Sequence, residues 1–173
     1  TIMRTTRLDY RTFELILAVS LELSVKCWKV AFHDGRRNKP RLVDCRAQTP
    51  AARLTELLEA IGEVRRRWGL SDEVPVLIGY EAGQDGFWLA RALEAMGLTV
   101  LVMDSASIPV KRQARRCKTD RLDAIQLVML LRRWLQGEED AFSRVRVPSL
   151  EDEDQRSLVR ERQQLVKERN QHR

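Results

Sequence analysis

Four carboxylates in this chain have the spacing of a shared chemical site. Glu22 lies near the end of one apolar run and Glu81 ends another. Asp120 and Asp123 are three residues apart at the start of an amphipathic segment, so they share one helix face. Sites in α/β sheets gather at the carboxyl ends of strands. The four acids therefore predict an oxygen-rich pocket for Mg²⁺ or Mn²⁺, a pair of which suits phosphodiester chemistry.

Each acid also has an ordinary structural interpretation, which the sequence leaves open. Asp120 and Asp123 in a first helical turn could serve only to offset the helix dipole. Glu81 could be a strand-terminal acid without a ligand, and Glu22 could face solvent. A glutamate directly after VLIGY and before AGQDG is, however, an unusual place for a merely solvated charge.

A basic stretch precedes the acidic pair. Residues 105–118 are polar and basic, and their cations are Lys111, Arg112, Arg115, Arg116 and Lys118. Such a stretch either holds nucleic-acid phosphates next to the carboxylates or forms a solvated loop.

The elements that must position these residues follow an α/β order. Apolar periodicity predicts strands at 13–23, 26–33 and 41–47, a helix to about residue 68, a strand at 74–81, a helix at 87–96, a strand at 98–104 and a helix after residue 119. This order predicts a mixed sheet flanked by helices, with the first three strands as an antiparallel meander.

The C-terminal part differs in kind. The residues around Pro148 read as a linker. From about Leu150 the chain is highly charged, and apolar pairs recur seven residues apart, at 158–159 and 165–166. This pattern predicts a coiled-coil arm that needs a partner. The pattern breaks off at Arg173, which indicates a fragment cut within a longer helix.

Composition narrows the class of protein. The chain has 173 residues, is 43% hydrophobic and carries a net charge of +6, which suits a polyanionic partner. Three cysteines without CxxC spacing argue against a disulfide scaffold and a zinc ribbon. No apolar run reaches the roughly 20 residues of a membrane span, and the first residues lack a signal-peptide pattern. We therefore expect a cytoplasmic protein with no membrane partner.

Two motifs carry a resemblance to a known family. The stretch YEAGQDGFWLARALEAMGLTVLVMDSASI, residues 80–108, and the box KTDRLDA, residues 118–124, resemble the N-terminal domain of the DEDD transposases. These are the insertion-sequence one-hundred-ten family, related to the Piv-type DNA invertases. The resemblance covers about residues 13–170.

The resemblance implies a domain organisation. It implies a RuvC-like, ribonuclease H-like domain at 13–145, after an N-terminal extension at 1–12. A linker and the start of a coiled-coil arm follow at 146–173. A separate C-terminal domain with a serine nucleophile would lie beyond.

The family's acids are carried over residue by residue. Glu81, Asp120 and Asp123 match the motif, but the first strand, SLELSVKCWKVAF, departs from it. A match without a gap puts Glu22 where the family has aspartate, and Ser20 where it has glycine. The resemblance thus implies Glu22, Glu81, Asp120 and Asp123 as catalytic, metal-binding acids.

The implied function is the metal-binding part of a DNA transposase. It would act in RNA-guided DNA strand cleavage and exchange during insertion-sequence transposition, at the nucleoid. Its partners would be DNA, a structured guide RNA and further copies of the chain, as a dimer or tetramer through the C-terminal helix. Two alternatives stay open: a self-contained Mg²⁺-dependent nuclease or resolvase, and a non-catalytic nucleic-acid-binding dimerisation module. As a transposase fragment, the chain would be inactive alone.

Overall fold

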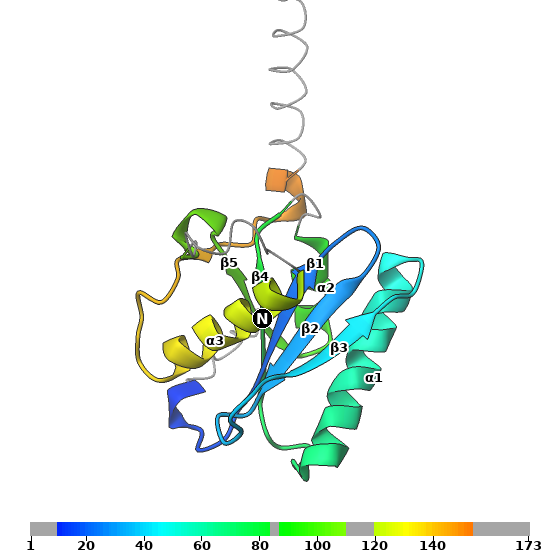
Figure 1. Ribbon diagram of the computed structural model, residues 1–173. Coiled ribbons are helices and arrows are strands. Elements are labelled where there is room, and N and C mark those ends of the chain that lie inside the picture. The colour runs from blue at the N-terminus through cyan, green and yellow to red at the C-terminus, as the bar shows by residue number, and fades with distance from the viewer. Residues whose placement is uncertain (1–9, 84–86, 110–119, 154–173) are drawn as a thin grey trace, which may run out of the picture.

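The computed structural model describes residues 10–83, 87–109 and 120–153, and it contains one six-stranded sheet (Figure 1). The strands are β1 (Leu17–Leu23), β2 (Trp28–His33), β3 (Arg41–Cys45), β4 (Val76–Glu81), β5 (Thr99–Met103) and β6 (Arg144–Val145). The helices are α1 (Pro50–Trp68), α2 (Trp88–Ala95) and α3 (Asp120–Leu135), with short 3₁₀ turns η1 (Tyr10–Thr12) and η2 (Ser105–Ser107).

The sheet is mixed, as the sequence predicts. Its strand order is β3-β2-β1-β4-β5-β6. Strands β1, β2 and β3 form the antiparallel meander, whereas β4 and β5 run parallel to β1. Strand β6 pairs antiparallel with β5 at the far edge. The carboxyl ends of β1, β4 and β5 therefore meet at one end of the sheet.

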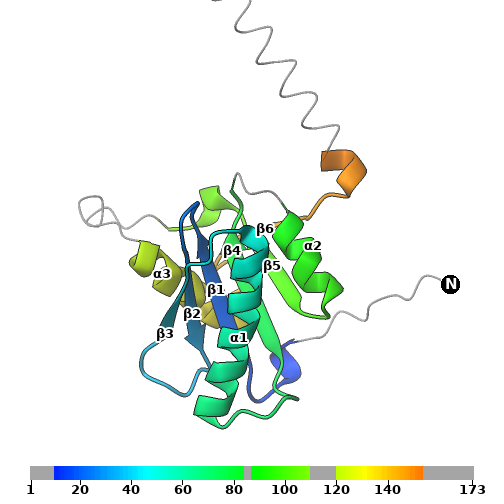
Figure 2. The ribbon, with the colours of Figure 1, turned by 90° about the vertical axis from the view of Figure 1, so that its right-hand side faces the viewer.

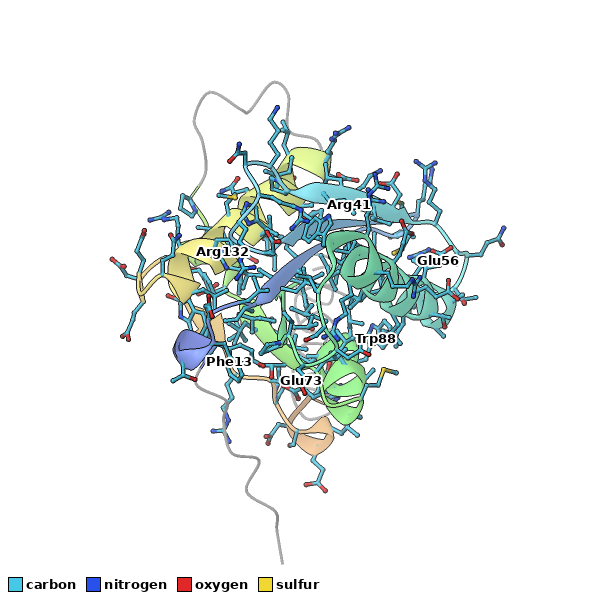
Figure 3. The ribbon with its side chains drawn as sticks, turned by 90° about the horizontal axis from the view of Figure 1, so that it is seen from below. Phe13, Arg41, Glu56, Glu73, Trp88 and Arg132 are labelled. Carbon is cyan, nitrogen blue, oxygen red and sulfur yellow. The ribbon has the colours of Figure 1, made fainter. Side chains whose placement is uncertain are left out.

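The helices cover both faces of the sheet, which gives three layers (Figure 2). One core lies between the sheet and the helices α1 and α2, and a second lies between the sheet and α3. Seen from below, Arg132 of α3 lies on one side of the sheet, while Glu56 of α1 and Trp88 of α2 lie on the other (Figure 3). Residues that alternate along a strand thus point into different cores.

The first helix has the sequence signals that predict it. The hydroxyl of Thr49 accepts a hydrogen bond from the Ala52 N–H at 3.2 Å, and Pro50 occupies the first helical position. Gly69 ends the helix in the left-handed region, with φ of 65°. Helix α1 therefore has fixed ends, and its amino end follows the carboxyl end of β3.

The packed structure extends beyond the expected boundaries at both ends. Strand β1 begins at Leu17 rather than at residue 13, because Phe13 packs against Tyr10, with ring centroids 6.3 Å apart. Tyr10 itself is buried in the α3 core, although the sequence assigns it to an N-terminal extension.

The residues before Pro148 are not a free linker. Ala141 and Phe142 are buried in the α3 core, and β6 follows them. Arg91 of α2 donates to the Pro148 carbonyl oxygen at 3.2 Å and pairs with Glu153 at 2.5 Å. Residues 141–145 therefore belong to the packed domain, and residues 148 and 153 are held against α2.

Two expectations fall outside the described residues. The coiled-coil pattern lies within 154–173, and the five cations of the basic stretch lie within 110–119. Among the described helices, none is both long enough and apolar enough to cross a membrane.

Candidate functional site

Glu22 is the penultimate residue of β1 and Glu81 is the last residue of β4, and these two strands are adjacent in the sheet. Strands β1 and β4 are parallel, and their register pairs Leu21 with Tyr80. The next residues in each strand are Glu22 and Glu81, so these are neighbours at the carboxyl ends. Paired strands lie about 4.8 Å apart. The sheet therefore brings two acids from distant parts of the chain to one edge, as the sequence predicts.

Both glutamates belong to the α3 face of the sheet. Leu21 and Tyr80, which precede them, are buried in the core under α1 and α2. Because side chains alternate between faces along a strand, Glu22 and Glu81 point the other way. Both are half-buried, on the face against which α3 packs.

Helix α3 brings the other two acids to the same end of this face. Asp120 and Asp123 lie in its first turn, with Asp120 exposed and Asp123 half-buried. The Ser20 hydroxyl, two residues before Glu22, donates to the Ala124 carbonyl oxygen at 2.6 Å. This buried hydrogen bond fixes the first turn of α3 against β1. The position of Ser20 thus has a structural use that the sequence does not reveal.

The four acids share an end and a face, but they do not yet form a ligand cluster. Among the described residues, no three side chains of histidine, cysteine, aspartate or glutamate are close enough together to hold a metal ion. The donor chemistry does fit, because carboxylate oxygens are the ligands that Mg²⁺ and Mn²⁺ prefer. The backbone places the four acids at one end of one sheet face, and a metal site there stays a prediction.

Sequence reasoning missed three further residues of this edge, Lys29, Asp44 and Arg46. The β1–β2 register pairs Glu22 with Lys29, and the β2–β3 register pairs Lys29 with Asp44. Lys29 Nζ lies 2.6 Å from Asp44 Oδ2, and Arg46 Nη2 lies 2.6 Å from the same oxygen. The hydrogen bonds from Lys29 and then from Arg46 lower the pKa of Asp44. The Asp-Gly turn before β3 could have suggested this register.

A pocket lies beside the acidic edge. Its lining residues are Ser24, Val25, Lys26, Cys27, Lys29, Arg46 and Asp120. The β1–β2 hairpin supplies most of them, α3 supplies the aspartate, and the residue after β3 supplies the arginine. Three cations and one carboxylate thus face the same hollow, next to the ends of β1 and β2.

A second charged cluster occupies the opposite end of the sheet. Asp34 is 3% exposed; it accepts the N–H of Arg36 at 3.0 Å and forms an ion pair with Arg37. Gly35 has a φ of 81°, and a Cβ there would overlap the Arg132 guanidinium. The cluster holds the β2–β3 turn against α3, and this structural role accounts for its buried charge.

The chain is similar in sequence to three transposases or candidate transposases. The chain is 38% identical over 155 residues to a candidate transposase of Sinorhizobium fredii; the match covers 89% of the chain and 39% of that protein. It is 36% identical over 86 residues to the transposase for insertion sequence element IS1533 of Leptospira borgpetersenii, covering 50% of the chain and 23% of that protein. A second candidate transposase of S. fredii is 39% identical over 94 residues, covering 54% of the chain and 22% of that protein.

The chain therefore spans well under half the length of these relatives. No family model matches the chain. Among solved structures, T. thermophilus RuvC in complex with a Holliday junction substrate aligns with a TM-score of 0.43 and 12% identity, over 75% of this chain and 99% of that one.

Proposed function

We propose that this chain is the acid-bearing part of a DNA transposase of the DEDD type, and that its acids act in the cleavage and exchange of DNA strands. One observation carries the proposal. The β1–β4 register makes Glu22 and Glu81 neighbours on the face under α3, whose first turn carries Asp120 and Asp123. The similarity to one candidate transposase over 89% of the chain supports the same reaction class.

The acids are proposed to hold one or two divalent cations, Mg²⁺ or Mn²⁺. Glu22 and Glu81 would contribute from the strand ends, and Asp120 and Asp123 from the helix. A bound cation would supply charge neutralisation at a phosphodiester and a more acidic water. The chain itself fixes the backbone positions of the four residues that carry these carboxylates. Their mutual repulsion makes the site favour a cation.

The remaining features of the proposal come from the family resemblance. The sheet would be of the ribonuclease H-like, RuvC-like type, and the serine nucleophile would lie in a C-terminal domain beyond an arm that joins two or four copies. A structured guide RNA would direct the protein to its DNA, with the basic stretch at 111–118 holding phosphates. The protein would act in the cytoplasm, at the nucleoid.

Excision of a DNA element by the full-length protein tests the proposal. Glu22→Gln, Glu81→Gln, Asp120→Asn and Asp123→Asn should each reduce strand cleavage by about a hundredfold or more, as expected when a transition-state contact is lost. Glu59→Gln, an exposed acid on α1, is the matched control and should cleave normally.

The two alternative functions give different results. Cleavage of branched DNA by the 173-residue chain alone, with Mg²⁺, would identify a self-contained nuclease and contradict the transposase proposal. Cleavage by all four acid variants at the normal rate would leave only a binding module.

A further inference from the structure

The hollow next to the acids has an excess of positive charge on one wall. Lys26, Lys29 and Arg46 line it, and Asp120 is the carboxylate among the lining residues. Lys29 and Arg46 both contact a single oxygen of Asp44, so one negative charge is shared between two positive charges. We call Lys26, Lys29 and Arg46 the basic wall.

The basic wall and the acids divide the site by element. The wall comes from the β1–β2 hairpin, β2 and the residue after β3, whereas the acids come from β1, β4 and α3. Lys29 is the register partner of Glu22, so these two oppositely charged residues lie opposite each other on neighbouring strands. A polyanion with a phosphate over the acids would have its neighbouring phosphates over cations.

The hairpin that carries the wall is rigidly held by a buried arginine. Arg53 of α1 is 5% exposed, and its guanidinium donates to the carbonyl oxygens of Ala47 at 2.7 Å, Val25 at 2.6 Å, Ser24 at 3.3 Å and Gln48 at 3.4 Å. Burying a guanidinium is costly unless its donors are satisfied. Here that cation joins the hairpin tip to the β3–α1 junction.

The same junction has a second tie. The Glu56 carboxylate accepts the Ala47 N–H at 3.0 Å, and Arg46 directly precedes Ala47. Lys26 and Arg46 therefore project from two segments that Arg53 connects. Val25, the residue before Lys26 at the hairpin tip, is 85% exposed, so the tip is open to a ligand. A pre-formed, open, basic surface is the kind of site that binds phosphates without reorganisation.

We propose that the basic wall is a DNA backbone-binding site, which positions the phosphodiester over Glu22, Glu81 and Asp123. This role of the basic wall rests on the proposed function, because it concerns the same site. The wall contacts phosphates rather than base edges, so its binding is independent of sequence and sensitive to salt. It is separate in the sequence from the basic stretch at 111–118, since its residues come from the β1–β2 hairpin, from β2 and from the residue after β3.

Fluorescence anisotropy with a labelled DNA duplex of arbitrary sequence tests the proposal on the 173-residue chain, in EDTA and over a range of salt concentrations. Lys26→Ala/Arg46→Ala should weaken binding roughly tenfold and lower the salt slope by nearly two, because two phosphate contacts are lost. Arg66→Ala/Arg67→Ala removes two exposed cations from the last turn of α1, at the other end of the sheet, and should match wild type.

Two further variants separate charge from folding and from metal binding. Lys26→Arg/Arg46→Lys keeps both charges and should retain wild-type affinity. The alanine pair should keep the rise in melting temperature that Mn²⁺ gives the wild type, whereas Glu22→Gln should lose that rise and still bind DNA. If Mn²⁺ does not raise the melting temperature of the wild type but the alanine pair still loses DNA affinity, the result counts against the proposed function rather than against the basic wall.

Three results would overturn the proposal. One is wild-type DNA affinity and salt slope in the alanine pair. Another is an equal loss in the charge-preserving pair, which would point to disrupted folding instead. The third is a loss of RNA affinity in the alanine pair while its DNA affinity stays that of wild type, which would assign the surface to RNA.

Discussion

Ser20 joins the strand that carries Glu22 to the helix that carries Asp123. Its hydroxyl is fully buried and donates to the Ala124 carbonyl oxygen at 2.6 Å. We expect Ser20→Ala to lower the free energy of unfolding by about 1 kcal/mol, the usual net value of such a bond. Urea unfolding measures this change.

The matched control is Thr55→Ala. The Thr55 hydroxyl also donates to a helix carbonyl, that of Ala51 at 3.3 Å, but on an exposed surface. It should change stability little. Equal losses in both variants would mean that the Ser20 bond has no special role in fixing α3.

His33 makes stability depend on pH at the opposite end of the sheet. Burial, and then the nearby positive charge of Arg132, lower the pKa of His33 below 6.5, against the opposing effect of Asp34. Its Nδ1 accepts the Gly35 N–H at 2.8 Å, which requires the neutral ring. The unfolded chain therefore takes up the proton first, and the contribution of His33 is present above about pH 6.5 and lost as the pH falls.

Comparison of unfolding at about pH 7.5 and about pH 5.5 tests this account. The His33→Asn variant offers an amide oxygen to the same N–H and cannot take up the proton. Its stability should fall less over this range than that of wild type. An identical fall would assign the pH dependence to other groups.

At the scale of elements, the β1–β2 hairpin depends on α1 through Arg53. Arg53→Met would leave the carbonyl oxygens of Ser24, Val25 and Ala47 without this donor. We expect a loss of about 3 kcal/mol in unfolding free energy. Arg66→Met, on the exposed side of the same helix, is the control and should cost little. Chemical denaturation of both variants measures the difference, and similar values for the two would contradict the anchoring role.

The main strands and helices were predictable because their apolar periodicity is strong. The errors occurred where tertiary contacts decide. The apolar FELI run beginning at Phe13 extended the predicted first strand, but Phe13 packs on Tyr10 instead of joining the sheet. Strand β6 was missed because it has two residues, and the burial of Phe142 just before it depends on α3.

The candidate site was predictable in part for the same reason. Glu22 and Glu81 lie near the ends of apolar runs that predict strands, and sites in α/β sheets gather at the carboxyl ends of strands, so the two acids could be placed at one edge. The ion pair between Lys29 and Asp44 follows from the register of β2 with β3 rather than from spacing along the chain. In the sequence Ser20 appears only as a departure from a motif. Its hydrogen bond to Ala124 depends on how α3 packs against β1, which spacing along the chain does not reveal.

At the scale of the whole molecule, the charged C-terminal segment should mediate self-association. Its apolar pairs recur seven residues apart, and two to three heptads are marginal for a coiled coil. We expect a weak dimer at high concentration that is lost when residues 154–173 are deleted. Sedimentation velocity on both forms measures this, and a wild-type chain that stays monomeric at every concentration would contradict it.

Binding of Mn²⁺ to the 173-residue chain, measured by isothermal titration, tests whether the four acids form one metal site. We expect saturable binding in wild type and in the Glu59→Gln control. We expect at least about tenfold weaker binding in Glu22→Gln, Glu81→Gln and Asp123→Asn, because each would remove a ligand. Wild-type affinity in Glu22→Gln, or a wild-type chain that binds Mn²⁺ no better than the variant lacking all four acids, would contradict the claim that these acids form one metal site.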